Sequence, residues 1–368
     1  MKISVIMANY NGARYLPAAI ASLQRQTVQD WELIICDDAS NDNSAKIAQN
    51  AAASDDRIKF VANPSNKGAA AARNLGLDAA DGDWIAIVDS DDLLHPQRFE
   101  QMLELAQAGH PLIADDLLYF SESASAAGRT HLQALDLTAP KQFDFNEVML
   151  SDMPSSPTPS LGYTKLFVAK SLVDGLRYDE SMKVSEDFDF LLRLLARTPS
   201  LTVMPDPMYL YRRHTSSLSY RSSVEIALAT STAHDRMLKW IPEGADIKAA
   251  HATRSAILDH RLAFEELVAD IKARRVNSAL SRLAKRPALL KDLYRSAREG
   301  LKRRLAQRSQ QPSIVSLPPK SVQASIPTNG IWPNPPHSVG AALSLGARSA
   351  DLSPWFQLLA AELDHATG

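Results

Sequence analysis

The chain is organised around the stretch Trp84-Ile85-Ala86-Ile87-Val88-Asp89-Ser90-Asp91-Asp92, in which five mostly apolar residues are followed by three carboxylates in four positions. An apolar run of this length predicts a buried strand, which ends where the charge begins. Because three carboxylates this close repel one another, their ionised forms need a positive partner. A divalent cation is the simplest partner, since Mg²⁺ and Mn²⁺ take carboxylate and phosphate oxygens as ligands. The alternative is a solvated acidic turn that caps a helix beginning near His95-Pro96.

Apolar runs typical of strands alternate along the chain with longer segments typical of helices. The predicted strands are Ile3–Met7, Trp31–Cys36, Ile58–Val61, 84–88, 111–120, 165–169 and 208–211. The predicted helices are 14–26, 43–53, 66–80, 95–108 and one that begins at Glu186-Asp187 with Ser185 as its N-cap. Residues 121–160 are expected to be irregular. This alternation predicts an α/β fold, with a mostly parallel sheet flanked by helices.

Polar clusters follow three of the predicted strands, at Ala8–Asn11, Asp37–Asp42 and Asp89–Asp92. Ligands of open α/β sheets bind beyond the carboxyl ends of the strands, so these clusters predict one shared site. A dinucleotide-binding site would need G-x-G-x-x-G after the first strand, but the segment Asn9–Arg14 contains one glycine. A Walker-type phosphate loop is also absent from the sequence, so both of these site classes are excluded.

The composition of the 368 residues is that of a globular protein with one large or two modest domains. The single cysteine, Cys36, excludes an internal disulfide, which suits a reducing compartment. No signal peptide is recognisable at the start of the sequence, and no apolar run approaches the ~20 residues of a membrane span. A cytoplasmic location is therefore expected, with peripheral contact at the inner face of the cell membrane left open.

Positive charge is concentrated in residues 270–308, which hold 13 Lys/Arg and 3 Asp/Glu in a chain of net charge −2. From about 222 to 308 the pattern is helical, and the basic segment carries an apolar stripe with Lys/Arg around it. Three interpretations of this stripe remain open. It forms a solvated helix face, it contacts anionic lipid, or it packs on the first domain or on a second subunit. Nucleic-acid binding is not expected, because few aromatic residues are interleaved with the basic ones.

The last 60 residues change character, since seven of the 21 prolines fall between Pro312 and Pro336. Such a composition predicts an extended linker. A short helix is expected at 354–363. The predicted organisation is an α/β domain at 1–221, a basic helical extension at 222–308, a Pro-rich linker at 309–340 and a C-terminal tail at 341–368.

Residues 1–221 resemble the inverting family 2 glycosyltransferases, which have the GT-A fold. The segments that carry the resemblance, in the family's order and spacing, are Val5–Asn11, Ile34–Ser40, Asn66–Gly68 with Arg73-Asn74, Val88–Asp92, Tyr178–Glu180, Glu186-Asp187 and Tyr211–His214. More loosely, Asp115–Leu117, Leu161–Tyr163 and Tyr211–Ser219 are similar to segments of bacterial exopolysaccharide glucosyltransferases of the succinoglycan type. The function that this resemblance implies is transfer of a hexose from a UDP-sugar to a saccharide acceptor, with glucose as the expected hexose and a lipid-linked saccharide as the expected acceptor.

The resemblance assigns the nucleotide-sugar site to the three strand ends and the loop before Arg73. It implies that Tyr10 stacks on the uracil, that Asp38 binds the edge of the base, and that Ala8 contributes its backbone. Arg73 is expected near the ribose or the phosphates. The remaining residues that it places in this site are Lys67, Asp89 and Ser90.

The resemblance also implies a Mn²⁺ or Mg²⁺ site and a catalytic base. Asp91 is expected to bind the metal, with Asp89 toward the ribose side of it, and His214 is a further candidate for the diphosphate or the metal. Asp187 is the expected base. The acceptor hydroxyl attacks the anomeric carbon while the bond from this carbon to the diphosphate breaks. A metal would neutralise the charge that develops on the leaving diphosphate, and a carboxylate would take the proton of the attacking hydroxyl. Glu186 and Asp189 are expected to raise the pKa of Asp187.

Each assignment has a structural alternative. The alternative for Tyr10 is a packing role, for Asp38 a role in the turn, and for His214 a structural role. Asp92 is expected to be a structural or helix-capping carboxylate. Asp115 and Asp116 are expected either to shape the sugar site or to lie in a surface turn. Two other function classes are a sugar-phosphate nucleotidylyltransferase, which would need a Gly-rich phosphate loop, and a non-catalytic nucleotide-sugar-binding protein, which would not need both Asp91 and Asp187.

Overall fold

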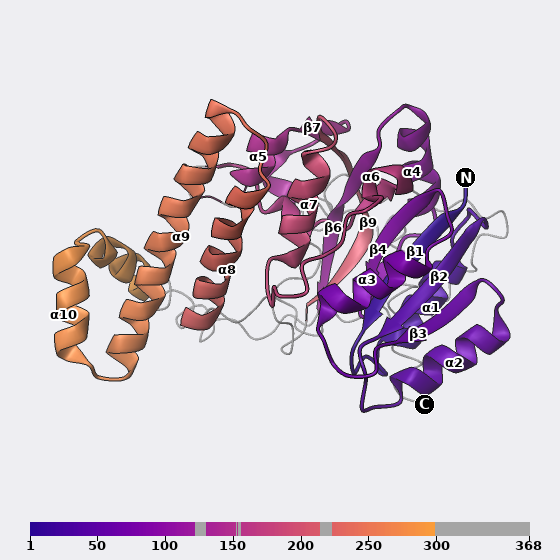
Figure 1. The fold of residues 1–368 in the computed structure, drawn as a ribbon, viewed down its shortest axis with the longest axis horizontal. Helices are drawn as coiled ribbons and strands as arrows, with labels where there is room; N and C mark the ends of the chain where they lie inside the picture. The colour runs from indigo at the N-terminus through magenta and orange to yellow at the C-terminus, as the bar shows by residue number, and fades with distance from the viewer. Residues whose placement is uncertain (122–129, 152, 154–155, 214–222, 299–368) are drawn as a thin grey trace, which may run out of the picture. The chain divides into compact units, whose positions relative to one another are not determined.

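The computed structural model describes residues 1–121, 130–151, 153, 156–213 and 223–298. The chain forms two compact units that divide between His214 and Thr215. The first unit is an α/β domain, and the second is helical (Figure 1). The predicted linker at 309–340 and the predicted helix at 354–363 lie outside the described residues, and the predicted domain boundaries stay predictions.

The first unit is built on one mixed sheet with the strand order β3-β2-β1-β4-β8-β6-β9-β5, and β7 pairs with β9. The bounds of the strands are β1 Ile3–Asn9, β2 Trp31–Asp37, β3 Ile58–Ala62, β4 Trp84–Asp89, β5 Leu93–Leu94, β6 Leu112–Ser121, β7 Lys141–Phe143, β8 Phe167–Ala169 and β9 Leu201–Arg213. Strands β1 to β4 are parallel, as are β6 and β9. Strands β5, β7 and β8 run antiparallel to their neighbours. The predicted α/β class with a mixed, mostly parallel sheet is confirmed.

Helices flank this sheet on both faces (Figure 1). Their bounds are α1 Leu16–Gln24, α2 Ser44–Ser54, α3 Ala69–Ala79, α4 Arg98–Gln107, α5 Phe145–Met149, α6 Lys170–Val173 and α7 Glu186–Leu195. Alternate residues of β1 point to opposite faces, so Val5 and Met7 pack with α1 and α4 while Ile6 meets α3. Helix α3 lies so close to the sheet that a Cβ on Gly76 would be 2.5 Å from Cγ2 of Ile6.

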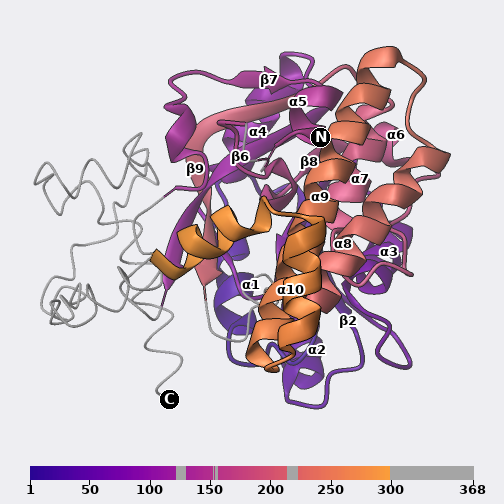
Figure 2. The same cartoon turned by 90° about the vertical axis from the view of Figure 1, so that its left-hand side faces the viewer.

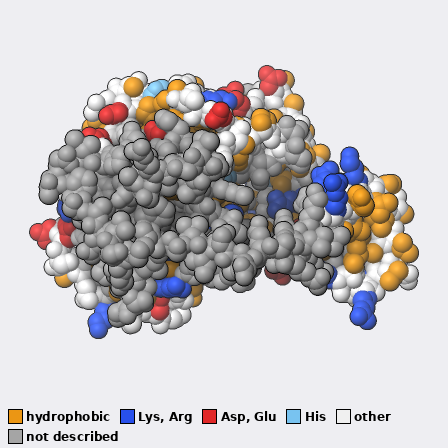
Figure 3. All heavy atoms as spheres, turned by 180° about the vertical axis from the view of Figure 1, so that it is seen from behind, with side chains coloured by type: hydrophobic (Ala, Val, Ile, Leu, Met, Phe, Trp, Pro, Cys, Tyr) orange, Lys and Arg blue, Asp and Glu red, His pale blue; other side chains and the backbone are white. Residues whose placement is uncertain are grey.

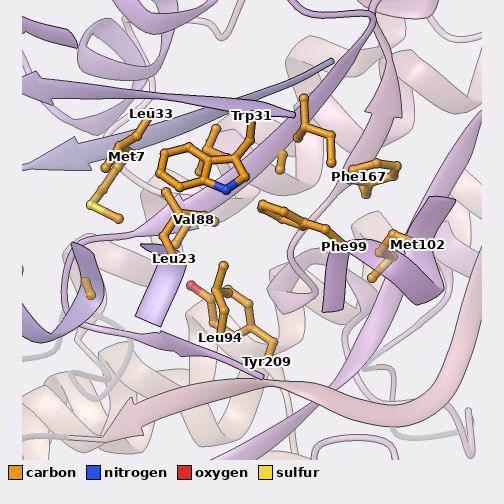
Figure 4. Close-up of a cluster of buried hydrophobic side chains, with 14 of the residues drawn as sticks. Met7, Leu23, Trp31, Leu33, Val88, Leu94, Phe99, Met102, Phe167 and Tyr209 are labelled. Atoms are coloured by element: carbon orange, nitrogen blue, oxygen red, sulfur yellow. The ribbon is translucent and has the colours of Figure 1, made fainter. Parts of the chain in front are cut away.

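The main core lies on the face of the sheet covered by α1, α2 and α4. Figure 4 shows Trp31, Val88 and Phe99 from three segments pointing into this core. The Trp84 and Phe167 rings stack at 4.9 Å, which joins β4 to the antiparallel strand β8. This core holds the end of β4, and with it the acidic stretch, in a fixed place.

The largest departures from the predicted elements are in two places, apart from the short elements β5 and α6, which were not predicted. Strand β9 has 13 residues rather than the four expected. The strand continues through Pro205 and Pro207 because both lie in an irregular segment, where the pairing with β6 jumps from Met204 to Tyr209 and no ladder hydrogen bond from proline is needed. Strand β7 and helix α5 fall within the segment expected to be irregular. The capping box of α5, in which Asp144 and Glu147 bond each other's backbone N–H, is visible in the sequence as D-x-x-E and was a missed signal.

The second unit consists of α8 Val224–Arg236, α9 Ala245–Lys272, α10 Val276–Lys285 and a further helix at 289–298. Helices α8 and α10 both pack against the long helix α9 (Figure 2). A small core forms from Ala263, Leu267, Ala279 and Leu289. The predicted C-terminal helical extension is therefore confirmed for 223–298. In the ranges that the structure describes, none of the helices has the length and apolarity needed to cross a membrane.

Candidate active site

The acidic turn after β4 brings three carboxylates together at the carboxyl edge of the sheet. One oxygen from each of Asp89, Asp91 and Asp92 lies within 4.8 Å of the others. Asp92 is 1% exposed, and it accepts hydrogen bonds from the Tyr209 hydroxyl (2.8 Å) and the Arg212 backbone N–H (2.7 Å). Burial raises the pKa of Asp92, and the charges of Asp91 and Asp89 raise it further. The expected structural role of Asp92 fits this geometry, and the alternative of a solvated turn is wrong.

Asp89 is held by two buried cations. Its carboxylate lies 2.5 Å from Nζ of Lys165 and 3.2 Å from Nη2 of Arg73. Burial by itself would raise the pKa of Asp89, but Lys165 and Arg73 outweigh burial and hold the pKa below its usual range. Sequence reasoning missed Lys165. The signal was a lysine directly before the apolar run Leu166–Val168, where a charge is costly unless it is paired.

Arg73 joins the acidic turn to the first turn of α7. Its Nη1 lies 3.0 Å from Oε1 of Glu186 and 3.0 Å from Oδ1 of Asp187. One guanidinium, 5% exposed, therefore contacts three carboxylates from two segments nearly a hundred residues apart. The contact with a nucleotide expected for Arg73 stays a prediction, and the contacts in the structure give it a positioning role.

Asp187 is the carboxylate of this group with the chemistry of a base. Burial raises its pKa to about 6, with Arg73 opposing the rise and Glu186 adding to it. Glu186 therefore raises the pKa of Asp187, as expected. Asp189 instead forms an ion pair with Arg193 at 2.8 Å, one turn along α7. A carboxylate with a pKa near 6 is ionised at neutral pH and is a stronger proton acceptor than an ordinary aspartate.

Ser185 does not cap α7, contrary to the expectation. Its φ is 65°, in the left-handed region, and its side chain makes no capping hydrogen bond. Asn11 and Ala39 have similar φ values, of 52° and 58°. All three lie in the loops that surround the site, where strained backbone is typical of sites that hold side chains in a fixed orientation.

The loops after β1 and β2 form the neighbouring part of the site. Tyr10 is 49% exposed, so it is not a core packing residue. The carboxylate of Asp38 accepts hydrogen bonds from the backbone N–H groups of Lys67 (2.9 Å) and Gly68 (2.7 Å). Asp38 thus fixes the loop that leads into α3, while the Lys67 side chain is exposed. Ala8 pairs with Asp89 across β1 and β4, next to these loops.

Three of the other candidate residues have clear positions, and one does not. Ser90 is buried in the acidic turn, and a Cβ on Gly12 would lie 3.2 Å from its Oγ, so the loop after β1 packs on this turn. Asp115 and Asp116 are buried in β6, so the surface-turn alternative is wrong for both. Nε and Nη2 of Arg98 bond Asp115 at 2.8 and 2.9 Å. His214 lies outside the described residues.

The acidic turn has the donors that a hard divalent cation needs. Both oxygens of Asp89 face cations of the protein, and both oxygens of Asp92 accept hydrogen bonds. Asp91 lies between them in the turn and is half-buried, and its role as a metal ligand stays a prediction. The arrangement combines an acidic turn, a carboxylate with a raised pKa and an exposed aromatic ring at one sheet edge, which suits attack of a hydroxyl on a substrate with an anionic leaving group.

Comparisons with known proteins agree with this arrangement. The family model "Glycosyl transferase family 2" matches residues 4–160. The succinoglycan biosynthesis protein ExoO of Rhizobium meliloti is 30% identical over 321 residues, which are 86% of this chain and 90% of that protein. The Escherichia coli UDP-Glc:alpha-D-GlcNAc-diphosphoundecaprenol beta-1,3-glucosyltransferase WfgD is 41% identical over 104 residues, 28% of this chain and 40% of that protein.

A solved structure shows the same fold at low sequence identity. The mannosyltransferase PcManGT of Pyrobaculum calidifontis, in complex with GDP-Man and Mn²⁺, matches with a TM-score of 0.53 and 14% identity. The match covers 82% of this chain and 80% of that one. At this identity the likeness concerns the fold alone.

Proposed function

The chain belongs to glycosyl transferase family 2, and from this premise we propose that it transfers a hexose, with inversion, from a UDP-sugar to a saccharide acceptor. The observation that carries the proposal is the set of contacts that Arg73 makes with Asp89, Glu186 and Asp187. These contacts join the acidic turn to the candidate base Asp187, although the two are far apart in the sequence. Inversion needs one base and a leaving group on the opposite side of the reacting carbon, and no covalent intermediate is required.

The leaving diphosphate would be received at the acidic turn. Mn²⁺ or Mg²⁺, held by Asp91 with Asp89 beside it and His214 as a further candidate ligand, would neutralise the charge that develops on the diphosphate. Lys165 and Arg73 keep Asp89 ionised, so this carboxylate is preorganised before substrate binds. Asp92 holds the turn through Tyr209, whose hydroxyl also accepts a hydrogen bond from the Asp89 backbone N–H at 3.0 Å.

Asp187 would take the proton of the acceptor hydroxyl. Its Oδ1 is fixed by Arg73 at 3.0 Å, which orients the carboxylate. The raised pKa of Asp187, about 6, brings its basicity closer to that needed at neutral pH. Once protonated, Asp187 loses the proton again at neutral pH, because its pKa lies below 7, and the base is restored for the next turnover.

The nucleotide would bind across the loops after β1 and β2. The exposed ring of Tyr10 would stack on uracil, with Asp38 and the Ala8 backbone at the same edge of the sheet. Lys67 and Ser90 complete the proposed nucleotide-sugar site. UDP-glucose as donor rests on the resemblance to succinoglycan-type glucosyltransferases and on the donor in the name of WfgD.

We further propose that the acceptor is lipid-linked and that the protein works in the cytoplasm, at the membrane surface, in exopolysaccharide or other surface polysaccharide synthesis. Support comes from the names of the two relatives, and from exposed side chains of the second unit. Val276 and Leu280 of α10, four residues apart, are 63% and 59% exposed, and Leu290 and Tyr294 repeat this spacing at 61% and 69%.

Basic side chains accompany these exposed apolar pairs. Figure 3 shows Lys/Arg and hydrophobic side chains close together on the described part of the second unit. Arg275 and Arg282 are paired with Asp270, but Lys272, Arg274, Lys285, Lys291 and Arg298 have no carboxylate partner among the residues that the structure describes. Unpaired cations around an apolar stripe match the chemistry of an anionic lipid surface.

The proposed function is tested by release of UDP from a set of UDP-sugars, with and without Mn²⁺, by the full chain and by Asp91→Ala. The expected result is turnover of at least one UDP-sugar that needs the metal and falls about 100-fold or more in Asp91→Ala. Asp174→Asn, an exposed aspartate in the same unit, is the matched control and keeps full activity. Metal-independent turnover, or full activity of Asp91→Ala, would remove the metal role of Asp91. Binding of UDP-sugars without any turnover would support a non-catalytic binding protein.

A further inference from the structure

Four ring side chains form a connected cluster in the first unit: Tyr119, His131, Tyr163 and Tyr211, here called the aromatic cluster. Tyr119 contacts Tyr211 edge to face at 5.8 Å between ring centroids, and it contacts His131 at 5.9 Å. His131 in turn contacts Tyr163 edge to face at 5.8 Å. The rings come from β6, β9, the short helix η2 (Leu161–Tyr163) and the segment after residue 130, so the fold has gathered them from four places.

The aromatic cluster borders the proposed catalytic groups. Nζ of Lys165 lies 5.7 Å from the Tyr211 ring centroid and 2.5 Å from Asp89. Helix η2 packs against α7, which carries Asp187, and the contact is close: a Cβ on Gly162 would lie 2.8 Å from Cδ2 of Phe188. Tyr163 is therefore held beside the helix of the candidate base, and a side chain at Gly162 would push it away.

The polar edges of the aromatic cluster are fixed. His131 Nε2 lies 2.7 Å from the Ser160 carbonyl, which only accepts hydrogen bonds, so Nε2 carries the proton. Nδ1 of His131 is then the acceptor of the hydrogen bond from the Tyr119 hydroxyl at 2.6 Å. The Arg213 guanidinium lies over the Tyr119 ring at 4.5 Å. These contacts order the cluster before any ligand arrives.

Tyr163 is the exposed member of the aromatic cluster. Among the described residues of the first unit, three large hydrophobic side chains are exposed: Met1, Tyr10 and Tyr163, the last at 41%. Met1 is the first residue, and Tyr10 has the proposed role of stacking on the base. An exposed ring that is anchored by ordered neighbours next to a candidate base has the features of a binding surface.

We propose that the aromatic cluster is a subsite for the acceptor saccharide, in which Tyr163 presents its ring to the apolar face of a pyranose. One face of a pyranose carries axial C–H groups, and these pack on the electron-rich face of an aromatic ring. The hydroxyl groups at the sugar's edge meet polar groups such as the Arg213 guanidinium. The sugar is thereby placed between the exposed ring and Asp187, with one hydroxyl toward the base. This inference rests on the proposed function, because it names the acceptor side of the same site.

The test is saturation-transfer NMR on the full chain with UDP and Mn²⁺, using methyl glycosides of glucose, galactose, mannose and N-acetylglucosamine as probes. The expected result is saturation of ring C–H protons in at least one probe. Tyr163→Ala is expected to weaken binding of that probe roughly 3- to 10-fold. Tyr163→Trp retains a ring and is expected to keep the affinity. UDP affinity, measured by calorimetry, is expected to be unchanged in both variants.

Tyr10→Ala is the matched variant, since it removes the other exposed tyrosine and is expected to weaken UDP while sparing the sugar. Equal sugar affinity of Tyr163→Ala and the unchanged chain, or no saturation of any probe, would overturn the proposal. Loss of UDP affinity in Tyr163→Ala would also overturn it and assign the ring to the nucleotide. Failure of the proposed function is distinguishable, because it appears as absent turnover of UDP-sugars while sugar binding is measured independently. Melting temperatures of the variants within about 2 °C exclude unfolding as the cause.

Discussion

At the scale of single residues, the site depends on how two cations divide their charge among three carboxylates. Arg73 and Lys165 face Asp89, and Arg73 also faces Glu186 and Asp187. Burial raises the pKa of both Asp89 and Asp187. At Asp89 the two cations outweigh burial and lower the pKa, whereas at Asp187 burial outweighs Arg73 and the pKa is raised. A pair of carboxylates with pKa values driven apart is typical of sites that need one permanent anion and one proton acceptor.

The pH dependence of the reaction follows from the pKa of Asp187. The base works only when ionised, and burial raises its pKa to about 6, so it is protonated below that pH. The rate of transfer at low substrate concentration is expected to fall about tenfold per pH unit below pH 6 and to level off above it. A pH–rate profile measures this limb, with melting curves at each pH to exclude acid unfolding. An acid limb near pH 4, the range of an ordinary aspartate, would contradict the assignment.

Replacement of Lys165 tests the electrostatic coupling. The charge of Lys165 lowers the pKa of Asp187, so Lys165→Met is expected to move the acid limb of the pH–rate profile to higher pH. Lys165→Arg keeps the charge and is expected to keep the limb in place. A limb that stays at the same pH in Lys165→Met would show that Lys165 acts only on Asp89.

At the scale of elements, the strand ends of β1, β2 and β4 were predictable from the sequence, but the partners contributed by Lys165 and by β9 were not. The pattern of apolar strands followed by polar turns located β1, β2 and β4 and the acidic turn, because local periodicity and turn chemistry decide them. The partners that complete the site come from long-range packing. Lys165 precedes β8, and Tyr209 lies in β9, 117 residues from its partner Asp92. Single-sequence patterns carry little information about such contacts.

Helix α4 and strand β6 are joined by a buried ion pair. The side chains of Arg98 and Asp115 are both 0% exposed, and the guanidinium makes two hydrogen bonds to the carboxylate. Asp115→Ala leaves a buried cation without its partner and is expected to cost about 3–5 kcal/mol of unfolding free energy. Chemical denaturation measures this cost.

The double variant Arg98→Met/Asp115→Leu is the control for this ion pair. It replaces both charges by apolar groups and is expected to lose much less stability than Asp115→Ala. A single variant as stable as the unchanged chain would show that Arg98 finds another partner.

At the scale of the whole molecule, the first unit and the second unit have surfaces of different chemistry. The negative groups described above gather at the sheet edge of the first unit. The exposed apolar pairs lie on α10 and the helix at 289–298, and the unpaired cations lie on these helices and at the end of α9. Composition predicted the basic extension, because charge is counted directly from the sequence. Which cations are neutralised by Asp270 depended on the packing of α9 with α10 and was not predictable.

Membrane contact is expected to depend on lipid charge and salt. The full chain should sediment with vesicles that contain phosphatidylserine, and much less with phosphatidylcholine vesicles or at 0.5 M salt. Val276→Ser/Leu280→Ser should weaken sedimentation with the anionic vesicles, because it removes apolar area. Leu228→Ser, on α8 and 52% exposed in the unchanged chain, is the control. Equal sedimentation by the double variant and the unchanged chain would reject these residues as the membrane contact.

The central claim is that Asp187 is the base of a glycosyltransferase site assembled around Arg73. The most direct measurement is the rate of sugar transfer by Asp187→Asn at saturating UDP-sugar and Mn²⁺, together with its affinity for UDP. Asparagine keeps the size of the side chain but cannot accept the proton, so we expect a loss of roughly 10²- to 10⁴-fold in kcat with little change in the Kd for UDP. Transfer by Asp187→Asn at the rate of the unchanged chain would contradict it.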